Sequence, residues 1–226
     1  MIDVSTPRGR VVAAALRLAA ERPWREVTLR DIGEAAGLPL DQLRKEFETR
    51  SGVLRAFIRS IDDEVLAKAP KKEAGETPRD ALFEVVMARL DALAPYKAAI
   101  LSILKSGPAG PADLAAVLKS QAWMLQAAGV ATHGPLGAAK VAGLASTYAA
   151  VLRTWLDDDD PGHARTMAVL DRRLRSGERS LQTLEDIRSG ACRIACMFRR
   201  GKRDKAADVP ASPPPAAEPS TGGAGI

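Results

Sequence analysis

Residues 23–54 decide the fold, and they read PWREVTLRDIGEAAGLPLDQLRKEFETRSGVL. The Thr-Leu-Arg-Asp segment that begins at Thr28 is a variant of the capping box with which helices start. Gly37 is the residue type that ends a helix, and the proline two residues later is suited to the start of the next one. The stretch therefore predicts helices over residues 29–36 and 39–47, joined by a tight turn, which is a helix-turn-helix.

The segments on either side complete a small head. Thr6 and Pro7 form a cap followed by a proline, which predicts a helix that stops near Pro23. A further helix, over residues 49–66, would close a core around the two short ones. We therefore expect a three-helix helix-turn-helix head, closed by that fourth helix, over residues 7–68.

The rest of the chain shows helical spacing of apolar residues between proline and glycine breaks, and no strand-like alternation of useful length. The fold class is therefore all-α, with the head followed by a larger helical bundle that forms the body over residues 77–200. From residue 205 to 226 proline, alanine, serine and glycine dominate, which predicts a disordered tail. The predicted body helices cover residues 78–94, 96–105, 111–128, 136–156, 163–176 and 181–200.

Composition limits the kind of partner. The 226 residues carry a net charge of +5, which permits an anionic partner, either nucleic acid or a membrane surface. Cys192 and Cys196 do not suggest a disulfide framework, and they lack the spacing of redox or zinc sites. No signal-peptide core and no apolar run long enough to span a bilayer is visible, so we expect a cytoplasmic protein.

The sequence offers no catalytic constellation. His133 and His163 are the only histidines, and neither has metal-ligating neighbours at a suitable spacing. The run of aspartates over residues 157–160 is best interpreted as a solvated turn that caps the next helix. We therefore expect no enzyme activity, no catalytic residue, no metal and no cofactor.

Two segments carry a family resemblance: PWREVTLRDIGEAAGL at residues 23–38 and FETRSGVL at residues 47–54. Both resemble the signature of the TetR family of transcriptional regulators, over about residues 8–66. The resemblance implies that residues 7–68 form a DNA-binding domain. It also implies a homodimer that binds double-stranded DNA at palindromic operators through the 39–47 helix. It also implies that the body holds the dimer interface and a pocket for a hydrophobic small molecule.

The expected DNA contacts lie on and around that helix. Arg44 stands where the family usually has tyrosine, and it can bind a phosphate or a guanine. Asp41 and Glu46 would oppose the phosphates, so a head that keeps the fold without binding DNA stays an alternative. The full set of expected DNA-binding residues is Arg30, Pro39, Leu40, Gln42, Arg44, Lys45 and Arg50, and Arg8 and Arg10 are further candidates for backbone contacts.

Three aromatic residues on the body helices are candidates for ligand binding. Trp123, Tyr148 and Trp155 are expected either in the core or on the wall of a pocket, because ligand pockets are mostly apolar with few polar groups.

A second resemblance covers residues 127–176. This region is similar to the lipid-binding accessory proteins of ubiquinone biosynthesis, which share the TetR fold, and it implies a lipid ligand. The basic amphipathic stretch over residues 181–203 would then touch a membrane surface, or else pack on the body or at a dimer seam. The expected function is a ligand-responsive transcriptional regulator, with this membrane-surface lipid-binding role and a protein–protein adaptor as alternatives.

Overall fold

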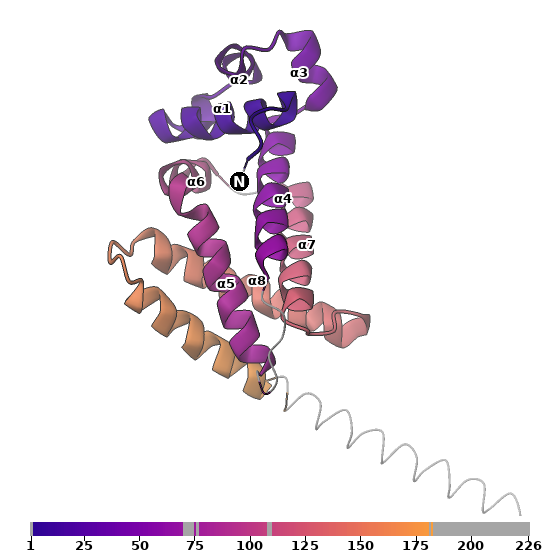
Figure 1. Cartoon of the computed structure of the whole chain (residues 1–226), viewed down its shortest axis with the longest axis vertical. Helices are drawn as coiled ribbons and strands as arrows, with labels where there is room; N and C mark the ends of the chain where they lie inside the picture. The colour runs from indigo at the N-terminus through magenta and orange to yellow at the C-terminus, as the bar shows by residue number, and fades with distance from the viewer. Residues whose placement is uncertain (1, 70–74, 76, 108–109, 181, 183–226) are drawn as a thin grey trace, which may run out of the picture. The chain divides into compact units, whose positions relative to one another are not determined.

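The computed structural model describes residues 2–69, 75, 77–107, 110–180 and 182. Within them every regular element is an α-helix or a short 3-10 helix, which confirms the all-α class (Figure 1). The predicted tail over residues 205–226 and, apart from residue 182, the predicted helix and membrane contact over residues 181–203 lie outside the described residues.

The head has the predicted order of elements. Its caps are also as predicted: Thr28 and Asp31 form the capping box, and Gly37 ends the first helix of the motif at a φ of +65°. The second helix begins at Leu40 because Pro39 is its extended N-cap rather than its first helical residue. The elements are α1 (Pro7–Glu21), η1 (Trp24–Glu26), α2 (Leu29–Ala36), α3 (Leu40–Glu46) and α4 (Arg50–Lys68).

The body contains α5 (Pro78–Leu93), η2 (Ala94–Tyr96), α6 (Lys97–Lys105), α7 (Pro111–Ala127), α8 (Gly134–Leu156) and a helix over residues 164–180. The predicted break at residue 176 is wrong, because the last helix continues past Gly177 to residue 180. The aspartate run caps the next helix as predicted: the Asp158 carboxylate accepts hydrogen bonds from the Thr166 amide and hydroxyl, at 3.0 and 2.6 Å. The expectation that the run is solvated is wrong for Asp158, which is only 6 % exposed.

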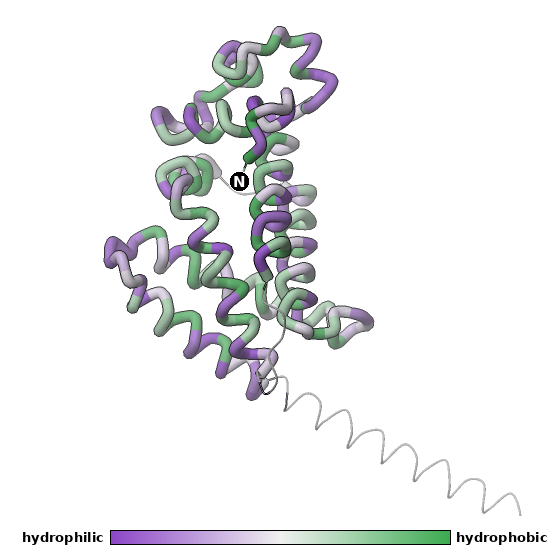
Figure 2. Tube along the Cα trace, viewed as in Figure 1, coloured by the Kyte–Doolittle hydropathy of each residue, from purple (hydrophilic) through white to green (hydrophobic). Residues whose placement is uncertain are grey.

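Two sets of contacts join the head to the body. α4 starts in the head and packs along α5 and α7, while α1 packs on α6. Hydrophobic residues recur along these helices among hydrophilic ones (Figure 2). At the junction the Ser102 hydroxyl accepts a bond from the Trp24 amide and donates to the Arg22 carbonyl, at 3.0 and 3.2 Å. α4 and α6 are therefore the helices through which the body contacts the head.

Candidate nucleic-acid interface and ligand cavity

The outer face of α3 offers side chains to a partner. Leu43 and the following Phe47 are buried and hold the helix against the head. Gln42, Arg44 and Lys45 are exposed, and Leu40 is exposed over 51 % of its surface. A short helix anchored on one side with amide, guanidinium and ammonium groups on the other has the chemistry that reads DNA in the major groove.

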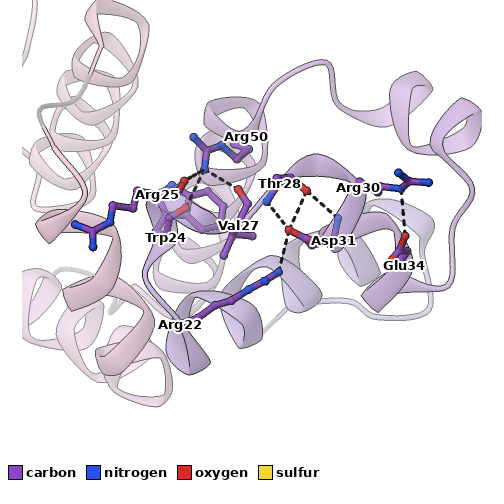
Figure 3. Close-up of polar contacts among 9 residues, drawn as sticks. All are labelled: Arg22, Trp24, Arg25, Val27, Thr28, Arg30, Asp31, Glu34 and Arg50. Carbon is purple, nitrogen blue, oxygen red and sulfur yellow. Dashed lines mark hydrogen bonds and ion pairs between the residues drawn. The ribbon is translucent and has the colours of Figure 1, made fainter.

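Arg30 lies at the start of α2, the other helix of the motif. Its Nε is 3.4 Å from the Glu34 carboxylate, one turn further on, and both side chains are largely exposed (Figure 3). An exposed pair of this kind is weak, so a phosphate can replace Glu34 as the partner of Arg30.

The two acidic residues of α3 are in different situations. A guanidinium nitrogen of Arg8 lies 3.8 Å from the Glu46 carboxylate, and this guanidinium stacks over the Phe47 ring at 4.6 Å. Glu46 therefore has a cation beside it from the start of α1. Asp41 lies in the first turn of α3, where a negative charge favours the helix.

Arg50 does not lie with the other DNA candidates. Its Nη1 donates to the carbonyl oxygens of Trp24 at 2.8 Å and Val27 at 2.6 Å, with a longer contact to that of Arg25 at 3.4 Å (Figure 3). The guanidinium also lies 5.5 Å from the Trp24 ring centroid. Arg50 therefore holds the η1 turn, which connects α1 to the helix-turn-helix, against the start of α4.

A cavity of about 380 Å³ lies between the head and the body helices. Its walls come from η1, from α4, α5 and α6, and from α7 and α8. About half of the lining residues have apolar side chains, and they include Leu54, Phe57, Ile58, Leu93, Ile100, Ile103, Val117 and Leu152.

One of the three aromatic candidates lines this cavity. Tyr148 does so and is itself almost fully buried. Trp155 is 1 % exposed but lies in the core beside Lys97, whose Nζ is 5.5 Å from the centroid of its ring. Trp123 is 44 % exposed on α7. Neither tryptophan lines the cavity.

Tyr148 belongs to a buried polar cluster that sequence reasoning missed. Arg89 donates through Nε to the Tyr148 hydroxyl at 3.1 Å and through Nη1 to the Asp62 carboxylate. The Ser120 hydroxyl donates to the same Asp62 oxygen at 2.8 Å. One signal could have revealed it: Arg89 occupies a position on the otherwise apolar face of α5, and a charge there requires a buried partner.

Burial and the neighbouring polar groups determine the charges of Tyr148 and Arg89. Burial raises the pKa of Tyr148 despite the nearby Arg89, so its side chain is a neutral phenol at physiological pH. Burial opposes the charged form of Arg89, but Tyr148 and Asp62 outweigh it and raise the pKa of Arg89 above its ordinary value. Arg89 and Asp62 lie together as a buried ion pair, so the positive charge of Arg89 has a carboxylate beside it.

Gln121 lines the same cavity with an unsatisfied side chain. The residue is 1 % exposed, and both its Oε1 and its Nε2 are buried without a hydrogen-bond partner. Buried amides in native proteins are nearly always paired, so the exception points to a missing partner.

Other kinds of site receive no support in the described part of the chain. Over these residues no group of three or more histidine, cysteine, aspartate or glutamate side chains could hold a metal ion. No helix among them is long and apolar enough to cross a bilayer.

Comparison with known proteins identifies the fold. No protein-family model and no curated protein matches the sequence. Among solved structures, a TetR transcriptional regulator from Nitrosomonas europaea is 23 % identical with a TM-score of 0.59, and the match covers 75 % of this chain and 96 % of that one. One from Rhodococcus sp. RHA1 is 21 % identical with a TM-score of 0.58, covering 75 % and 94 %. A tetR-family regulator from Streptomyces coelicolor is 16 % identical with a TM-score of 0.50, covering 86 % and 87 %. The described chain therefore has the fold of the TetR transcriptional regulators.

Proposed function

We propose that this protein is a homodimeric, DNA-binding transcriptional regulator whose α3 helix enters the major groove of each operator half-site. The observation that carries the proposal is the exposure of Gln42, Arg44 and Lys45 on a helix held from behind by Leu43 and Phe47. The fold shared with TetR regulators supports the same function.

The exposed side chains have distinct roles in this proposal. Arg44 and Lys45 bind guanine edges or phosphates, and Gln42 is suited to adenine. Leu40 offers an apolar contact to a thymine methyl group. Arg30 exchanges Glu34 for a phosphate. Arg50, by contrast, acts from within the head by holding η1, and Pro39 sets where α3 begins.

We further propose that a hydrophobic small molecule in the cavity regulates DNA binding. α4 begins at Arg50 in the head, and its Leu54, Phe57 and Ile58 line the cavity. A molecule that pushes on these side chains would tilt α4 and change the separation of the two α3 helices in the dimer. Half-sites lie a fixed number of helical turns apart, so such a change lowers operator affinity.

Fluorescence anisotropy tests the DNA-binding proposal. The full chain is titrated onto its own upstream DNA and onto a scrambled duplex of equal length, over a range of salt concentrations. We expect tighter binding to the upstream DNA, with an affinity that falls steeply as salt rises.

Two variants sharpen this test. Arg44→Ala should weaken binding to the upstream DNA by about five- to 150-fold, since a bidentate base contact contributes about 1–3 kcal/mol. Arg165→Ala removes an exposed arginine of the body and should have no effect. Equal affinity for both duplexes, or equal loss in both variants, would show that the head is a scaffold only.

A further inference from the structure

We propose that the cavity selects a neutral, mainly apolar molecule that presents a hydrogen-bond donor and an acceptor on adjacent atoms, as a carboxamide or a lactam does. The inference deepens the proposed function, on which it rests, because it names the chemical class of the regulating ligand. Two independent features carry it: the unpaired amide of Gln121 and the acidic partners of three of the four arginines on the cavity wall.

The apolar walls set the general character of the ligand. At about 380 Å³ the cavity lies near the lower end of the range for small-molecule sites. Phe57, Ile58, Ile100 and Leu152 offer no hydrogen bonds, so most of the ligand's surface must be apolar to match them. A sugar or a nucleotide would lose its hydration there without compensation.

Gln121 defines the polar group of the ligand. Its carbonyl oxygen needs a donor and its amide nitrogen needs acceptors, and no described side chain or backbone group supplies either. These two atoms belong to one planar group. A ligand with a donor next to an acceptor can therefore satisfy both at once, whereas a ketone satisfies only the nitrogen. The Tyr148 hydroxyl, whose oxygen accepts from Arg89, can donate its proton to the same ligand.

The charge balance argues against an acidic ligand. Arg89 is neutralised by Asp62, and Arg55 lies 2.9 Å from Asp113. Arg25 lies 3.5 Å from Glu26, whereas Arg50 has no acidic partner among the described residues, although its Nη1 donates to the η1 carbonyl oxygens. A carboxylate entering this cavity would lose its hydration, and three of the four arginines on the wall already have a carboxylate partner.

Calorimetry on the full chain without DNA tests the proposal with three matched probes. 2-Naphthamide has both donor and acceptor, 2-acetonaphthone has the acceptor alone, and 2-naphthoate is the anion. We expect 2-naphthamide to bind at least ten-fold more tightly than either of the others. Equal affinities, a preference for 2-naphthoate, or no detectable binding of 2-naphthamide would overturn the proposal.

Three variants connect that preference to its causes. Gln121→Leu should abolish the preference for 2-naphthamide over 2-acetonaphthone, while Gln126→Leu, on an exposed position of α7, should keep it. Asp62→Asn preserves the shape of the cluster but leaves Arg89 without a counter-charge, so the affinity for 2-naphthoate should rise at least ten-fold. A preference that survives Gln121→Leu, or an unchanged affinity for 2-naphthoate in Asp62→Asn, would contradict the assignment.

The outcome is separable from that of the DNA-binding proposal. Probe binding is measured with no DNA present, so selective binding of 2-naphthamide supports the cavity assignment even if the protein ignores its upstream sequence. Conversely, operator binding combined with unselective probe binding would leave the regulator proposal standing and refute the ligand class.

Discussion

Replacing Gln121 by leucine should make the protein more stable. The two side chains have similar volumes, and the site is 1 % exposed. Each unsatisfied buried donor or acceptor costs about 1–3 kcal/mol, and Gln121 has one of each. Leucine removes both costs and contributes apolar burial. Allowing for imperfect packing of the new side chain, we expect the free energy of unfolding to rise by about 2 kcal/mol.

Urea unfolding followed by circular dichroism measures this change, at one fixed protein concentration because a dimer's stability depends on it. The midpoint should rise at an unchanged slope, and the melting temperature should increase by about 4–8 °C. Gln126→Leu is the matched control on the same helix. As a substitution on an exposed position, it should stay within about 0.5 kcal/mol of the natural protein. A Gln121→Leu variant that is less stable than the natural protein would show that the amide is satisfied in solution, and the argument for a missing ligand would fail.

Three further predictions concern the head, α8 and the acidic turn. Arg50→Ala should lower the free energy of unfolding by about 2 kcal/mol, because it leaves the η1 carbonyl oxygens without their donor. Amide hydrogen exchange should then become faster in the η1 turn. Unchanged exchange there would refute the role given to Arg50. Gly137→Ala should lower the free energy of unfolding, since a Cβ there would lie 2.1 Å from a backbone carbon of the preceding loop. Gly143→Ala has open space around it, so the better helix propensity of alanine should raise the free energy of unfolding by about 1 kcal/mol. Thermal unfolding measures both changes. The hydrogen bond from the Thr166 side chain is the main reason that the pKa of Asp158 lies below its usual 3.8, so the ionised carboxylate stabilises the fold above pH 3.8, and this stabilisation is lost as the pH falls through the lower pKa of the folded state. In a plot of unfolding free energy against pH, Thr166→Val should therefore reduce the slope on the acid side. An unchanged slope would contradict this role of Thr166.

Local signals in the sequence predict the head well. The capping box at Thr28, the left-handed Gly37 and the proline at the N-cap of α3 are short-range features, because each depends on residues within one helical turn. The boundaries of α3 shift by one residue because a proline can serve either as an N-cap or as the first helical residue. The break predicted at residue 176 failed for a related reason: the glycine at 177 only weakens a helix, and it does not end one by itself.

The cavity could not be predicted in the same way. Its walls join residues far apart in the chain, such as Asp62, Arg89 and Tyr148, and periodicity says only which face of a helix is inward. The three aromatic candidates show that helical periodicity does not separate cavity-lining residues from core residues. Tyr148 lines the cavity, whereas Trp155 and Trp123 lie in the core and at the surface. A polar residue on an apolar face, as Arg89 is on α5 and Gln121 is on α7, is a better guide to such a site than an aromatic residue.

The DNA candidates show a second limit. Arg50 and Arg44 are equally basic in the sequence, but one guanidinium is directed at the η1 carbonyl oxygens and the other is exposed on α3. From the sequence alone, Glu46 is expected to repel the DNA phosphates. In the structure, however, Arg8 from the start of α1 lies beside its carboxylate. Only the tertiary arrangement separates structural arginines from those available to a partner.

The central claim is that the two α3 helices of a dimer bind the two half-sites of a DNA operator. Hydroxyl-radical footprinting of the protein's own upstream DNA tests this claim most directly. We predict two protected half-sites whose centres lie about one helical turn, or a multiple of it, apart, related by a two-fold axis and both lost in Arg44→Ala. Uniform protection at high protein concentration, or a footprint that Arg44→Ala leaves intact, would contradict it.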